Sequence, residues 1–71
     1  MDRLLRELLS RRDPRGYYVI PARNTEEARS LAESEGADVE EAGDVLYIRV
    51  KSRSAAARIA SRLARSGLLA L

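Results

Sequence analysis

The side chains that could do chemistry in this sequence are mostly arginines, and their spacing points to binding rather than catalysis. Arg58, Arg62 and Arg65 recur at four- and three-residue intervals, which places them on one side of a helix. The basic residues that lead into this row are Arg49, Lys51 and Arg53. Because a guanidinium group bonds phosphate oxygens through two parallel N–H groups, such a row suits nucleic-acid backbones. The sequence therefore predicts a nucleic-acid contact along this segment.

A tyrosine beside these residues favours RNA over DNA. An expected strand carries Tyr47, Arg49 and Lys51 at every second position. The three side chains would therefore share one face of a sheet, with Tyr17 beside them. An aromatic ring next to basic residues on an open sheet can stack an unpaired base. The alternative is that the arginines only solvate an amphipathic helix, while the tyrosines pack under the N-terminal helix.

The charges are strongly segregated along the chain. Residues 24–48 hold one arginine and eight acidic residues, residues 49–71 hold six basic residues and no acid, and the whole chain has a net charge of +2. Such segments can attract a partner of opposite charge or a second copy of the chain. They can equally neutralise each other within one fold, if the acidic second helix lies beside the basic third helix. In that case much of the arginine row is already occupied.

Several classes of chemistry have no residues to perform them. The sequence contains no cysteine and no histidine, so disulfides, thiolate or imidazole metal sites and thiol nucleophiles are absent. The single lysine, Lys51, lies near Ser52 and Ser54, but such pairs occur by chance and a chain this short has little room for a pocket. No glycine-rich phosphate loop is present. We therefore expect no enzyme, no cofactor and no small-molecule substrate.

The acidic residues of the expected hairpin do not form a convincing metal site. Glu40 and Glu41 are neighbours on a strand, so they point to opposite faces. A carboxylate site for Mg²⁺ or Ca²⁺ could use Asp38, Glu40 and Asp44, but the twelve-residue calcium-loop spacing is missing. A solvated acidic hairpin is the simpler interpretation, and we expect no bound metal.

With 71 residues, the chain has the length of one small domain. Apolar periodicity predicts a helix over 2–12 and a strand over 17–20 that stops at Pro21. A second helix should begin at Asn24 as its N-cap, with Glu27 in a capping-box position, and end at Gly36. Residues 37–50 should form a hairpin that turns at 42–44. The last helix should start at Ser52 or Ser54 and run to residue 66, before Gly67.

These elements predict the α+β class, in the order α-β-α-β-β-α, with a three-stranded sheet whose helices pack mainly on one face. The pattern does not decide the strand order. The layout is similar to that of small RNA-binding modules, but it lacks their Gly-X-X-Gly clamp and their aromatic-rich strand. No residue roles transfer from this likeness of layout.

Most of the leucines lie at the two ends of the chain. Seven of ten fall in the first nine or the last four residues, and the N-terminal group consists of Leu4, Leu5, Leu8 and Leu9. They either fold over a thin core or form an interface with another chain. The second option makes the protein an assembly subunit or homo-oligomer, with an N-terminal helix that is partly independent of the domain.

Composition also bears on the cellular location of the protein and on its adaptation to temperature. The longest apolar stretches are four residues, far short of the ~20 that span a bilayer, so we expect a cytoplasmic protein without a membrane partner. A 34% charged content and the absence of glutamine fit a thermophile. A GC-rich genome would give the same excess of arginine over lysine.

Overall fold

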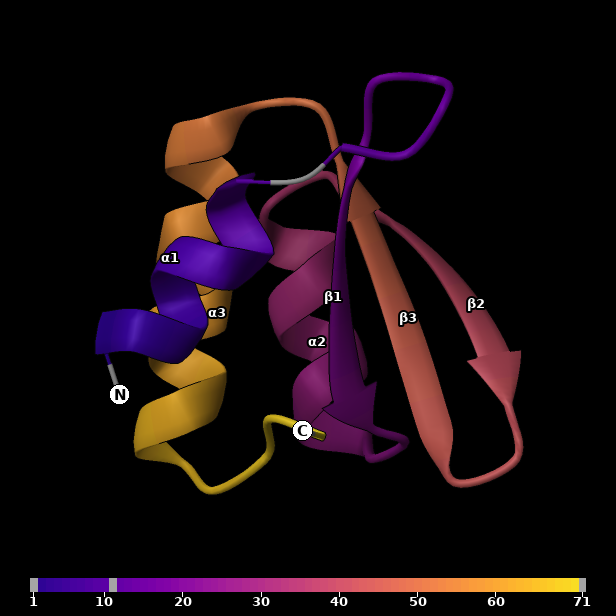
Figure 1. Ribbon diagram of the computed structural model, residues 1–71. Coiled ribbons are helices and arrows are strands. Elements are labelled where there is room, and N and C mark those ends of the chain that lie inside the picture. The colour runs from indigo at the N-terminus through magenta and orange to yellow at the C-terminus, as the bar shows by residue number, and fades with distance from the viewer. Residues whose placement is uncertain (1, 11, 71) are drawn as a thin grey trace.

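The computed structural model describes residues 2–10 and 12–70, without the side chains of residues 2, 4 and 5, and its elements follow the predicted α-β-α-β-β-α order (Figure 1). The elements are α1 (Asp2–Ser10), β1 (Tyr18–Arg23), α2 (Glu26–Ser34), β2 (Asp38–Ala42), β3 (Val45–Val50) and α3 (Arg53–Arg65). Three antiparallel strands form one sheet and the helices lie beside it, which confirms the predicted α+β class.

The strand order is β1-β3-β2, so the last strand in the sequence lies at the centre of the sheet. Ile48 of β3 pairs with Ile20 on one side and with Val39 on the other, and both pairings are antiparallel. Strands β1 and β2 therefore run parallel to each other without being neighbours. The β2–β3 hairpin turns at Gly43, whose φ of 61° fits the first position of a two-residue type II′ turn.

One face of the sheet carries the core. Leu46, Ile48 and Val50 alternate along β3 and are buried, whereas the residues between them are not fully buried. The three helices cover this face and leave the other one open (Figure 1). From α3, Ile59 and Leu63 enter the core with no exposed surface. Full burial of such side chains stabilises the fold by about 1.5–3 kcal/mol each.

The prediction that the first strand stops at Pro21 was wrong, because β1 continues to Arg23. Proline is tolerated in a strand when its missing N–H would point away from the sheet. The carbonyl of Pro21 accepts a hydrogen bond from Ala70 N at 3.0 Å, on the side of β1 opposite β3. The nitrogen of the same residue faces that outer side too, so the proline removes no hydrogen bond to β3.

The N-cap of α2 is Thr25 rather than the predicted Asn24. Thr25 Oγ1 accepts a hydrogen bond from Ala28 N at 3.1 Å. Asn24 instead connects the β1–α2 turn to the hairpin, since its side-chain amide donates to Glu41 Oε1 at 3.0 Å and accepts from Arg29 at 2.8 Å. A side chain engaged in these distant contacts is not available to cap its own helix.

The other helix ends agree with the predictions from the sequence, except for the end of α1. Ser52 caps α3 by accepting from Ala55 N at 3.2 Å, and Gly36 and Gly67 follow α2 and α3 with φ values of 70° and 71°. Helix α1 ends at residue 10 instead of the predicted 12. Arg12, expected in its last turn, lies over the ring of Tyr18 at 4.9 Å from its centre.

The terminal leucines whose side chains the structure describes pack against the chain's own core. These residues are Leu8, Leu9, Leu68 and Leu69. The tail also extends the sheet, because Leu69 forms a bridge with Ala22 on the outer edge of β1. Leu4 and Leu5, the other predicted interface residues, lie outside the described side chains. Self-association through the N-terminal leucines stays a prediction.

We expect the cost of shortening a leucine to follow its burial. Leu63→Ala should lower the free energy of unfolding by about 2–5 kcal/mol, because it leaves a cavity in the core. Leu31→Ala removes the same atoms from a half-buried position and should cost less than half as much. Urea denaturation followed by circular dichroism measures both values. Equal losses would contradict this description of the core.

Candidate nucleic-acid interface

The outer side of α3 carries the predicted arginine row. Arg58, Arg62 and Arg65 are exposed, while Ile59 and Leu63 on the opposite side are buried. The apolar positions fix the rotation of the helix about its axis, and the arginines therefore point away from the sheet. Along the axis the row extends over about 10 Å, at 1.5 Å per residue.

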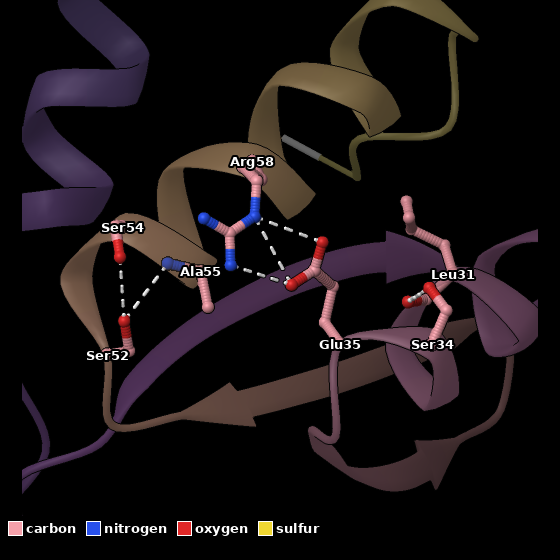
Figure 2. Close-up of polar contacts among 7 residues, drawn as sticks. All are labelled: Leu31, Ser34, Glu35, Ser52, Ser54, Ala55 and Arg58. Carbon is pink, nitrogen blue, oxygen red and sulfur yellow. Dashed lines mark hydrogen bonds and ion pairs between the residues drawn. The ribbon is translucent and has the colours of Figure 1, made fainter.

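The first arginine of the row is already paired within the protein. Arg58 donates to Glu35 through Nη2 at 3.0 Å and through Nε at 3.2 Å, in a forked arrangement that joins the end of α2 to α3 (Figure 2). The side chain of Glu35 is 16% exposed and that of Arg58 is 57% exposed. The hydrogen bond from Arg58 lowers the pKa of Glu35, and the same bond raises the pKa of Arg58. The expected neutralisation between the acidic and basic helices thus occurs at this position.

Four other basic residues of the C-terminal segment have no carboxylate partner among the described residues. They are Lys51, Arg53, Arg62 and Arg65, and all four are exposed. Lys51 lies over the ring of Tyr17, with its Nζ 5.1 Å from the ring centre, a contact that leaves its charge in place. The segment therefore keeps most of its positive charge available at the surface.

Tyr47 and Arg49 lie on the open face of the sheet, opposite α3. They alternate with the buried residues of β3, and Tyr47 is 36% exposed there. Arg49 forms an ion pair with Glu40 on β2, and the hydrogen bond between them raises the pKa of Arg49. Asp38 is opposite Arg49 in the same register. The structure thus does not bring these two residues together with the α3 row, and Tyr17 lies beside Lys51 rather than Tyr47.

A groove between α2 and α3 was not anticipated from the sequence. Its α3 side is lined by Arg62, Leu63 and Arg65, and its α2 side includes Leu31 and Ser34. Leu31 breaks the otherwise small and polar sequence of α2, but only the packing of the two helices shows that it faces the arginines. The last two residues of the predicted row therefore border a concave, partly apolar surface.

The comparisons with known proteins do not add to this geometry. No protein-family model, no curated protein and no solved structure matches the chain. Within residues 2–10 and 12–70, no group of three or more acidic side chains is arranged to hold a metal ion, and no helix is long and apolar enough to cross a membrane. Function is therefore inferred from the charged surface and the groove.

The Arg58–Glu35 pair should make stability depend on pH in a defined direction. Because the pKa of Glu35 is lowered from its ordinary value of 4.5, its contribution is present at neutral pH and is lost as the pH falls through the lowered value. Glu35→Gln should therefore be slightly less stable than wild type at pH 7, and the difference should shrink below pH 4.5.

Urea denaturation at several pH values measures this difference. Glu33→Gln is the matched control, since Glu33 is an exposed acid of the same helix without an ion pair among the described residues. A gap between wild type and Glu35→Gln that stays constant from pH 7 to pH 3, or that the control reproduces, would show that the ion pair does not hold the two helices.

Proposed function

We propose that this protein is a non-catalytic cytoplasmic binding module that contacts nucleic acid through the α3 basic surface, defined as Arg58, Arg62 and Arg65. The observation that carries the proposal is that Arg62 and Arg65 lie together on the exposed side of α3 and have no carboxylate partner among the described residues. When unpaired arginines neutralise phosphates, the counterions condensed on the nucleic acid are released, which favours binding to any nucleic-acid backbone.

The ion pairs elsewhere in the chain support this choice of surface. The acidic residues that are paired contact Arg29, Arg49 and Arg58, so the internal neutralisation falls mostly outside the α3 basic surface. To contact Arg58, a phosphate would have to displace the carboxylate of Glu35 from it. Since that pair is exposed on the Arg58 side, it stabilises the fold only weakly and is weakened further by salt.

The position of Tyr47 changes the form of the proposal. Base stacking on Tyr47 was the reason to favour RNA, but Tyr47 lies on the opposite side of the sheet from α3. The α3 basic surface contacts phosphates, which RNA and DNA share. The proposal therefore concerns nucleic-acid backbones in general, and Tyr47 is left out of the proposed site.

Charge reversal at the surface should weaken binding and its salt dependence together. Wild type should bind a short single-stranded RNA with micromolar affinity or tighter, and log affinity should fall with log salt with a slope of about −2, at about 0.7 for each phosphate that one of the three arginines neutralises. Arg62→Glu with Arg65→Glu should lower affinity at least tenfold and reduce the slope by about two thirds. Fluorescence anisotropy at several salt concentrations measures both, for single-stranded RNA and for duplex DNA.

A control with the same change in net charge separates a local site from general attraction. Arg15→Glu with Arg23→Glu alters two exposed arginines on the side of the open sheet face. This variant should retain most of the affinity and nearly the full slope. Equal losses in the two double variants would contradict a site on α3. No binding by wild type at low salt would contradict a nucleic-acid function altogether.

A further inference from the structure

The groove between α2 and α3 combines an apolar floor with two rims of different chemistry. Leu31 and Leu68 are half-buried and supply the accessible apolar surface of the floor, while Leu63, which also lines the groove, is fully buried. Arg62 and Arg65 form the rim on α3. The rim on α2 carries one carboxylate and two hydroxyls, from Glu27, Ser30 and Ser34.

Each part of this surface matches a part of a nucleotide. The flat face of a base can lie on apolar side chains, as it does in sites that hold a base outside a helix. Arginines beside the floor can hold the phosphate of the same nucleotide. Hydroxyl groups can bond either kind of group on a base edge, and a carboxylate accepts from amino groups such as that of cytosine.

We propose that the groove takes the base of an unpaired nucleotide whose phosphate is held by Arg62 and Arg65, so that the preferred ligand is single-stranded nucleic acid. This inference rests on the proposed function and names its substrate class. In a duplex the bases are stacked and paired, and their faces are not available to such a floor. A duplex would therefore contact only the α3 basic surface.

The charges of the rims favour a base over the apolar side chain of an acidic peptide. An acidic peptide would gain from Arg62 and Arg65 but would be repelled by Glu27 on the opposite rim. A base has no net charge, and its amino groups can donate to that same carboxylate. A ligand made only of phosphate would leave the leucine floor exposed to water.

The test compares ligands with and without bases. Fluorescence anisotropy is measured for a single-stranded RNA, an abasic single strand of the same length, and a duplex. Wild type should bind the RNA about tenfold more tightly than the abasic strand, in keeping with the contribution of one stacked base. Ser34→Leu, which fills the groove without changing charge, should lower RNA affinity to the abasic level and leave abasic binding unchanged.

Ser10→Leu is the matched control. Ser10 and Ser34 are exposed last residues of α1 and α2, and each donates its hydroxyl to the carbonyl three residues earlier, at 2.9 Å and 2.8 Å. The control should bind all three ligands as wild type does. Both variants are first shown to retain the wild-type circular dichroism spectrum.

The possible results separate the two proposals. Equal wild-type affinity for RNA and the abasic strand, or Ser34→Leu that binds RNA like wild type, would overturn the base site while leaving the phosphate surface in place. A third result would also overturn the base site. If bases made no difference to affinity, and wild type but not Ser34→Leu bound an acidic leucine-containing peptide, the groove would be assigned to a protein partner. No binding of any strand would overturn the proposed function itself.

Discussion

The burial of one side of β3 determines the position of every other element. Leu46, Ile48 and Val50 need an apolar cover, and the three helices supply it from the same side of the sheet (Figure 1). Since β3 is the central strand, β1 and β2 are both held in this arrangement by their registers with it. The outer side of the helical layer and the open sheet face then become two separate surfaces.

This separation divides the basic residues of the C-terminal segment into three groups. Arg49 is placed on the open sheet face, where Glu40 neutralises it. Arg58 is directed toward the end of α2, where Glu35 holds it. The remaining four keep their charge, and Arg62 and Arg65 border the groove. Segregated charge in the sequence therefore has two consequences, internal ion pairs and an available basic surface.

Features set by local chemistry were predictable from the sequence. The alternation along β3, the apolar side of α3, the Ser52 cap and the glycines after α2 and α3 depend on neighbouring residues alone. Errors arose where a distant contact decided the outcome. Pro21 stays in a strand because the C-terminal tail lies along its outer edge, and Asn24 gives up the cap position because it reaches the hairpin.

The candidate site was predictable to the same extent. The row on α3 follows from helix periodicity, so the sequence located it correctly on an exposed side. Whether Tyr47 could join it depends on which face of the sheet the helices cover, and strand alternation alone does not decide that. The groove depends on how α2 packs against α3, which involves Leu31 and Leu63 from distant parts of the chain. Such a surface has no local signature.

If the proposed function holds, the outer side of α3 and the groove beside it bind nucleic acid, while the open sheet face does not. The most direct measurement is a titration of isotope-labelled protein with single-stranded RNA, followed by two-dimensional amide NMR. We predict that the resonances that shift will belong to Arg62, Arg65 and Ser34, with those of Tyr47 and Glu40 unchanged. Shifts centred on Tyr47, or no shifts at low salt, would contradict the account.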